Sequence, residues 1–196
     1  MPRSSKAQSE VTGRTIREIA REMFSTRGYQ SVRLEEVAEA AGMTRGAVYH
    51  HHKNKQALFE AVLDDVHAEV EADVVRAAEE HDDAWTQLEA GCLAFLRAST
   101  APDVARILLV EGPAVVGWDA WRSHDRHHSY RQLEEVLQEL EDAGEVAAGT
   151  ARSAAPLLSG AMNEAALWLA GSSDLEDAAS IEKTLLVMLR ALRRSG

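Results

Sequence analysis

Two short helical patterns meet at a glycine in the first third of the chain. Apolar residues at helical spacing predict one helix over about Leu34–Ala41, and Thr44 is suited to cap a second helix over Arg45–His51. Gly42 permits the tight turn between them. A supporting helix, a tight turn and a second helix are the parts of a helix-turn-helix, which places its second helix in the major groove of DNA.

Longer helices are predicted on either side of this pair. Residues 10–26 carry apolar side chains at positions 16, 19, 20, 23 and 24, which fall on one helical face, and Gly28 lies where a helix commonly ends. A further helix is expected from about Lys55 to residue 80. The unit at residues 13–60 is therefore predicted to be a helix-turn-helix domain, preceded by a flexible basic tail at residues 1–12.

The candidate DNA contacts lie on the predicted second helix, beginning with its cap residue Thr44. Arg45 lies in its first turn, where a long donor can reach guanine or a phosphate, and Gly46 and Ala47 are small enough for close entry into the groove. Donors suited to phosphate oxygens follow at Tyr49, His50, His51, Lys53 and Lys55. Consecutive histidines point in different directions, so we expect a solvated helix end rather than a metal site.

The charge of the chain is unevenly distributed. The net charge is −11, but residues 1–60 carry 10 Lys and Arg against 7 Asp and Glu. A mildly basic front on an acidic body is compatible with one end facing DNA. The single Cys92 excludes an intramolecular disulfide, and no apolar run is long enough to suggest a membrane span or secretory signal. We therefore expect a cytoplasmic protein.

The remainder of the chain predicts only helices, so the fold class is all-α with about nine helices. Residues 61–196 are expected to form a second domain, into which the helix beginning near Lys55 continues to about residue 80. Its other predicted helices cover residues 85–99, 102–110, 112–143 (as one helix or a kinked pair), 151–170 and 174–194, and a Gly171–Ser173 linker precedes the last.

Residues 15–59 resemble the N-terminal domain of the tetracycline-repressor (TetR) family of bacterial transcription regulators. The resemblance rests on Gly28-Tyr29, Val37-Ala38 with Ala41-Gly42, the run Gly46-Ala47-Val48-Tyr49-His50-His51, and Lys53-Asn54-Lys55 with Leu58-Phe59. Several separated elements agree in register. The resemblance implies that the chain binds DNA through the second helix of the pair.

Three positions depart from the family pattern. Arg33 stands where Ser or Thr usually caps the second helix, so Ser31 is an alternative cap; Arg33 is also counted among the candidate DNA contacts. Val32 replaces a frequent Thr. His52 occupies a position that usually holds a buried aromatic residue, and if buried it needs a hydrogen-bond partner.

The resemblance further implies a C-terminal domain that binds a small molecule and forms a dimer. Together, the tryptophans and other apolar residues could line a cavity for a hydrophobic or aromatic effector, with Asn163 as a polar contact. Taken singly, an apolar residue of this kind is more often ordinary core, and Asn163 fits an exposed or interface face as well. The candidates are Cys92, Phe95, Leu96, Trp118, Trp121, Met162, Asn163 and Trp168. Dimerisation is expected through the last two helices, about residues 151–194, whose small and apolar residues allow close packing.

Two other classes of function fit the sequence less well. An enzyme needs a nucleophile–base pair, convergent carboxylates or a nucleotide loop, and the sequence shows none of these. A ligand-binding module that has lost DNA binding is compatible with Arg33 and His52, but Arg45, Tyr49, His51 and Lys55 argue against it. The sequence thus predicts a homodimeric repressor, without cofactor or metal, that leaves a palindromic DNA operator when it binds a small effector.

Overall fold

The structure is a computed structural model that describes residues 2–172 and 174–194. Met1, Ser173 and residues 195–196, which belong to the predicted tail, linker and second domain, lie outside this part. Within the described residues the chain forms eleven α-helices, one π-helical segment and no strand. The elements are α1 (Pro2–Arg27), α2 (Leu34–Ala40), α3 (Arg45–His51), α4 (Lys55–Glu79), α5 (Ala84–Ser99), α6 (Pro102–Ala105), η1 (Arg106–Glu111), α7 (Gly112–Val116), α8 (Trp118–His127), α9 (Ser129–Asp142), α10 (Ala151–Ala170) and α11 (Leu175–Arg190).

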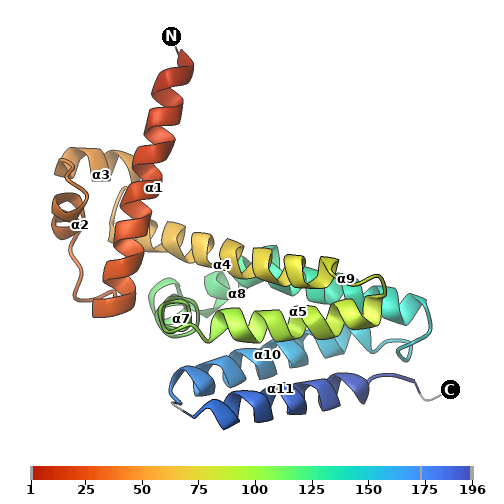
Figure 1. Ribbon diagram of the computed structural model, residues 1–196. Coiled ribbons are helices and arrows are strands. Elements are labelled where there is room, and N and C mark those ends of the chain that lie inside the picture. The colour runs from red at the N-terminus through yellow and green to blue at the C-terminus, as the bar shows by residue number, and fades with distance from the viewer. Residues whose placement is uncertain (1, 173, 195–196) are drawn as a thin grey trace.

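The helices form a small N-terminal unit and a larger helical body (Figure 1). Helices α1, α2 and α3 cluster around the start of α4, which then runs into the body. There α5 packs against α4, α9 and α10, while α11 lies at the outer edge against α5 and α10. One long helix therefore belongs to both units, and any tilt of α4 relative to the body would move α3.

The core of the N-terminal unit is built around aromatic rings. Phe24 of α1 and Phe59 of α4 are fully buried, with ring centroids 5.3 Å apart in an edge-to-face arrangement. Tyr29 packs on both rings, at 5.8 and 5.3 Å. The apolar face predicted for the first helix is buried here, since Ile16 and Ala20 are also inaccessible to solvent.

The π-helical segment η1 holds the end of α1 against the body. The Arg106 guanidinium donates to the carbonyl oxygens of Ser25 and Thr26, each at 3.0 Å, and the Glu111 carboxylate accepts from the Tyr29 amide at 3.1 Å. We call this set of five residues the η1 clamp: Ser25, Thr26, Tyr29, Arg106 and Glu111. The Arg106 and Glu111 side chains bond to main-chain atoms of residues 25, 26 and 29. The geometry of the clamp therefore depends on the path of the backbone around Gly28.

The structure changes several predicted boundaries. Helix α1 begins at Pro2, so the segment predicted as a flexible tail is helical from that residue onwards. The helices predicted over 102–110 and 112–143 are divided into five elements: the first consists of α6 and most of η1, and the second is broken at Gly117, which has a φ of 83°, and at His128. The predicted count of nine is therefore too low. No described helix is long and apolar enough to cross a membrane.

Candidate nucleic-acid interface and interior cavity

Helix α3 is fixed by one buried residue and one cap. Val48 is fully buried, while the Thr44 hydroxyl accepts a hydrogen bond from the Ala47 amide at 3.2 Å. Gly42 has a φ of 64°, as the predicted turn requires. The opposite face of α3 consequently exposes its polar residues.

The exposed face of α3 begins with Arg45. Its guanidinium lies 3.1 Å from a Glu35 carboxylate oxygen, donates to the Tyr49 hydroxyl at 3.4 Å and lies over the Tyr49 ring at 5.1 Å. These contacts are solvent-exposed and hence weak, so the side chain can exchange them for an acceptor on DNA. Gly46 is exposed beside it and Ala47 is half-buried, which leaves room for close approach.

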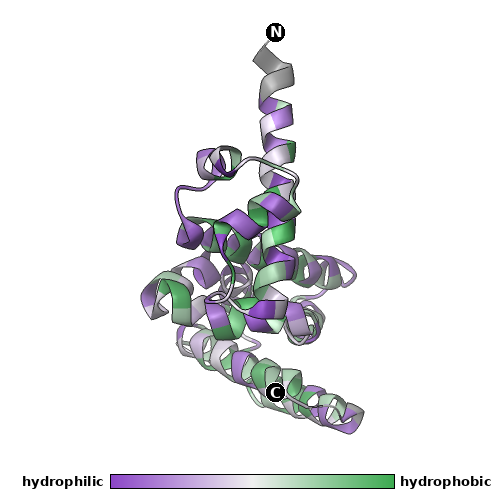
Figure 2. Ribbon diagram, turned by 90° about the vertical axis from the view of Figure 1, so that its left-hand side faces the viewer, coloured by the Kyte–Doolittle hydropathy of each residue, from purple (hydrophilic) through white to green (hydrophobic). Residues whose placement is uncertain are grey.

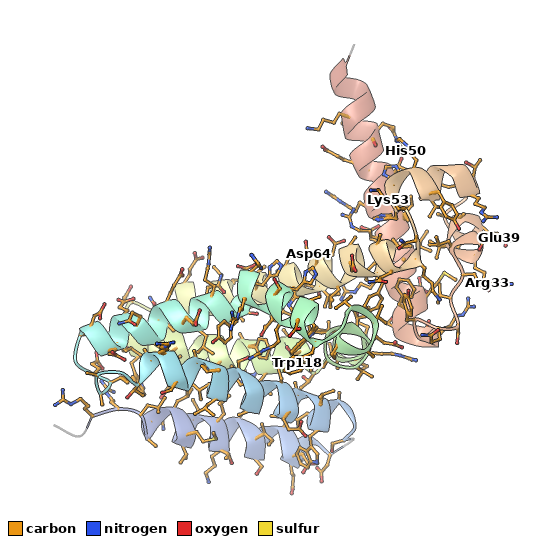
Figure 3. All side chains as sticks on the ribbon, turned by 180° about the vertical axis from the view of Figure 1, so that it is seen from behind. Arg33, Glu39, His50, Lys53, Asp64 and Trp118 are labelled. Carbon is orange, nitrogen blue, oxygen red and sulfur yellow. The ribbon has the colours of Figure 1, made fainter. Side chains whose placement is uncertain are left out.

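The other predicted DNA contacts separate into exposed and structural residues. Arg33, His50 and Lys53 lie on the same end of the molecule, remote from Trp118 on the body (Figure 3). All three are exposed. His51 is half-buried and packs near Gly13 of α1, where an added Cβ would lie 3.3 Å from its Nδ1. His51 is therefore partly committed to packing.

Lys55 is not a free phosphate donor, which corrects the role predicted for it. Its ammonium donates to the carbonyl oxygens of Tyr29, Gln30 and Val32 at 2.9, 3.3 and 3.0 Å, and lies 4.3 Å from the centre of the Tyr29 ring. An ammonium has three hydrogens, and all three are directed at main-chain oxygens. Lys55 thus ties the start of α4 to the loop before α2.

The structure shows how the chain accommodates Arg33 and His52, two residues that depart from the family pattern. Arg33, rather than Ser31, is the N-cap of α2: its amide donates to the Glu36 carboxylate at 2.9 Å, half of a capping box. His52 is 9% exposed, and its Nε2 has no hydrogen-bond partner among the described residues. Burial lowers the pKa of His52, and the nearby positive charge of Arg17 acts in the same direction.

Five of the eight predicted effector contacts do not line the cavity that is described next. Trp118 and Trp168 are exposed on the surface of the body, at 62% and 52%. Trp121 is buried, but its indole donates to the Leu108 carbonyl of η1 at 2.7 Å. Leu96 is core, and Asn163 is half-buried outside the cavity described next. Helical spacing identified apolar residues without showing which of them face one another.

An interior cavity of about 310 Å³ lies among α4, α5, α8, α9 and α10. Three predicted contacts, Cys92, Phe95 and Met162, do line it, together with Val74, Leu88, Leu133 and other apolar side chains. Burial raises the pKa of the Cys92 thiol to about 12, so this residue is an apolar wall rather than a nucleophile.

Polar groups from α8 and α9 also line the cavity. Asp125 is 4% exposed and accepts from Arg122 at 3.0 Å; burial raises the pKa of its carboxyl, although Arg122 acts in the opposite direction. The Ser129 hydroxyl and the Gln132 Oε1 are covered by protein yet have no partner in the described structure. An apolar cavity with a few convergent polar groups is typical of a small-molecule site.

Comparison with protein families shows what kind of protein carries these two features. Residues 16–62 match the model described as bacterial regulatory proteins, tetR family, and residues 85–192 match the tetracyclin repressor-like C-terminal domain. The chain belongs to the TetR family. The family consists of transcription regulators, not enzymes, and the N-terminal match covers the helix-turn-helix.

Individual relatives of this TetR-family chain agree with that assignment. A TetR-family regulator from Pectobacterium atrosepticum is 30% identical, with a TM-score of 0.80 over 96% of this chain and 97% of its own. The regulator TtgR from Pseudomonas putida is 40% identical over 83 residues, which are 42% of this chain and 39% of TtgR. FadR from Bacillus subtilis, solved with stearoyl-CoA, shares the fold at 18% identity, with a TM-score of 0.75 over 89% of this chain and 96% of its own.

Sequence reasoning about this TetR-family chain missed the polar side of the cavity. In the segment His124–His128, Asp125 is buried, and His128 contacts Glu71 at 2.7 Å and Asp64 at 3.1 Å. Within the described residues, no cluster of three or more His, Cys, Asp or Glu side chains is arranged to hold a metal ion. The available signal was the apolar spacing of α9, which places Ser129, Leu133 and Val136 on one face.

Proposed function

We propose that this chain is a homodimeric transcriptional repressor that leaves a palindromic DNA operator when a small apolar effector enters its cavity. Such a protein would act in the cytoplasm, where the DNA is. Family membership supports regulation of transcription in general terms. The residues that contact DNA, the dimer interface and the class of effector go beyond family membership and are proposed here for this chain.

The observation that carries the DNA-binding part is the exposed face of α3. Arg45, Tyr49 and His50 project from a helix that is held rigidly by Val48 and Thr44. Arg45 would read a base edge, since an arginine in the first turn can donate twice to guanine. Tyr49, His50, Lys53 and Arg33 would contact phosphates and set the position of the helix.

The dimer part rests on apolar side chains exposed on α10 and α11. Leu157 and Val187 are 73% and 60% exposed, and Trp168 and Met188 are 52% and 44% exposed. Hydrophobic segments run along these helices at the edge of the body (Figure 2). A cluster of large apolar side chains in water favours association, and pairing with a second copy would build a four-helix interface.

Two physical links could couple the cavity to α3. Helix α4 both lines the cavity, at Val74, and begins beside α3. The η1 clamp provides the second link, because Trp121 of α8 donates to Leu108 of η1 next to Arg106. An effector shifts the equilibrium only if it binds the DNA-free arrangement more tightly than the DNA-bound one.

The test of this function is footprinting on the DNA that flanks the coding region of the chain. We expect protection of an inverted repeat whose half-sites lie about 10 base pairs, or a multiple, apart. An Arg45→Ala variant should lose sequence preference while retaining weaker, salt-sensitive binding. Protection of a single half-site by a monomer, or no protected site at all, would contradict the proposal.

A further inference from the structure

The charged side chains that line the cavity are all acidic. Four of its residues carry carboxyl groups, and none is Lys, Arg or His. Asp125 lies at its buried end, while the three others are exposed residues at its rim: Glu79, Glu135 and Glu139. Arg122 is not among the lining residues, but its guanidinium donates to the lining residues Asp125 and Ser159, at 3.0 and 3.3 Å, and so neutralises part of the charge of Asp125. The three rim glutamates have no such partner among the lining residues.

Two residues that line the cavity, Ser129 and Gln132, carry buried oxygen atoms without a hydrogen-bond partner, and a small side-chain rotation would be needed to turn either atom towards a ligand. Gln132 Oε1 carries no hydrogen and can only accept a hydrogen bond, while the amide nitrogen of the same side chain donates to Glu71 at 2.8 Å. The Ser129 hydroxyl, on a residue 6% exposed, can accept as well as donate. Buried acceptors without donors are costly, so a ligand that brings N–H groups would relieve this cost.

From these observations we propose that the effector is a lipophilic cation, that is, an apolar body carrying a protonated amine, rather than a fatty acyl or other carboxylate. This inference rests on the proposed function and narrows it to a ligand class. The apolar walls at Leu88, Phe95 and Met162 would hold the body. The ammonium would lie near Asp125, Ser129 and Gln132, where its donors find acceptors and its charge is favoured.

The cavity volume limits the size of this cation. A volume of 310 Å³ is at the lower end of the range for small-molecule sites, about 300–1,000 Å³. A single ring with a short alkyl amine is consistent with that space. A long acyl chain with a large anionic headgroup would meet carboxylates at the rim and no basic residue in the lining.

Three compounds with the same phenylbutyl body separate the possibilities: 4-phenylbutylamine, 4-phenyl-1-butanol and 4-phenylbutanoate. Binding to the full-length chain would be measured by isothermal titration calorimetry at neutral pH. We expect the amine to bind at least about tenfold more tightly than the alcohol, and the carboxylate most weakly of the three. Equal or tighter binding of the alcohol or the carboxylate, or binding of none of the three, would overturn the inference.

Substitutions of residues that line the cavity test where the ammonium group binds. Ser129→Ala should weaken the amine several-fold, and Glu135→Gln with Glu139→Gln should reduce the preference for the amine over the alcohol. Asp142→Asn, an exposed position at the end of α9 that does not line the cavity, is the control and should change neither. A preference for the amine that is unchanged in all the cavity variants would place the cation elsewhere and overturn the inference.

The same samples distinguish this inference from the proposed function. Release of operator DNA by each compound would be followed by fluorescence anisotropy. If the amine binds preferentially but does not release DNA, the ligand class stands and the proposed effector mechanism fails. If the carboxylate binds best and releases DNA, the repressor mechanism stands and the ligand class is wrong.

Discussion

Lys53 and Lys55 lie two residues apart, yet they have different environments. Lys53 is exposed at the DNA-facing end, whereas the Lys55 ammonium is directed at three carbonyl oxygens of residues 29–32. Their positions in the sequence suggested one shared role in phosphate binding. The structure separates them into a candidate DNA contact and a residue that holds a loop.

Replacing each lysine by methionine tests this separation, because methionine keeps most of the aliphatic stem. Lys55→Met should lower the stability of the fold by about 1–3 kcal/mol, since three carbonyls lose a charged donor. Lys53→Met should leave stability unchanged and reduce the slope of log affinity for DNA against log salt by about 1. Urea unfolding and salt-dependent anisotropy measure the two effects; a Lys55→Met variant of native stability would refute the structural role.

Arg45 and Arg33 form a second matched pair of residues. Both are exposed at the same end, but Arg45 lies in the first turn of α3 and Arg33 caps α2. Arg45→Ala should cost about 1–3 kcal/mol of discrimination at one base pair of each half-site. Arg33→Ala should instead weaken binding similarly across sequences. Competition assays with single-base operator variants distinguish these results, and the reverse pattern would exchange the two roles.

His67 makes the stability of the body depend on pH. It is 2% exposed on α4, stacked on His128 and His124, with the carboxylates of Asp64 and Glu71 beside those two rings. Burial lowers its pKa from 6.5 to about 3. The folded state therefore excludes a proton that the unfolded chain accepts, and this contribution to stability is complete above about pH 6.5 and lost as pH falls towards 3.

A His67→Phe variant should unfold with a weaker pH dependence between pH 6.5 and 4. The difference between the two proteins can reach about 1.4 kcal/mol per pH unit, the limit for one proton. His128 acts with the opposite sign, because its carboxylate partners raise its pKa and its contribution is lost as pH rises. Urea titrations at several pH values provide the measurement, and parallel curves for both proteins would show that His67 is not the responsible group.

At the scale of the element, the η1 clamp connects the body to the end of α1, in addition to the ion pair between Arg21 of α1 and Asp103 of α6. An added Cβ at Gly28 would lie 2.8 Å from an Arg106 nitrogen and 2.9 Å from a Glu111 oxygen, so the clamp needs the glycine for space as well as for its φ of 81°. π-Helical segments are rare in proteins, and those that do occur are often found at functional sites. The clamp is therefore a good candidate for transmitting the state of the cavity.

Arg106→Met should uncouple effector from DNA without abolishing either interaction. DNA affinity and effector affinity, each measured alone, should change little. The effector-induced loss of DNA affinity should fall several-fold, a sizeable part of the 1–3 kcal/mol typical of allosteric coupling. Arg126→Met on α8, an exposed arginine, is the control. If the effector lowers the DNA affinity of Arg106→Met as much as that of the unchanged protein, the clamp does not transmit the signal and α4 remains the candidate for that role.

The elements differ in how far the sequence predicts them. Gly42, Thr44 and the apolar positions of α2 and α3 act within a few residues, so local chemistry is enough to define the helix-turn-helix. The cavity depends on which faces of five helices meet, and spacing along one helix does not determine that. Trp118 and Trp121 illustrate this: they are adjacent on α8, yet one is exposed and the other donates to η1.

At the scale of the whole molecule, the apolar surface of α10 and α11 has a testable consequence. Leu157→Glu combined with Val187→Glu should yield a monomer in sedimentation equilibrium at micromolar concentration. Losing the second recognition helix should weaken operator binding by about 100-fold or more, because the two half-sites are no longer bound together. Val110→Glu, which changes another exposed valine, is the control. A double variant that remains dimeric would place the interface elsewhere.

The η1 clamp also bears on how this protein could be recombined with its relatives. Arg106 and Glu111 bond to main-chain atoms of residues 25, 26 and 29, so they do not depend on the side chains that α1 carries there. A chimaera that takes its N-terminal unit from another family member should keep these bonds if it preserves Gly28 and the length of the turn. The body of this chain should then control an operator that it does not normally bind.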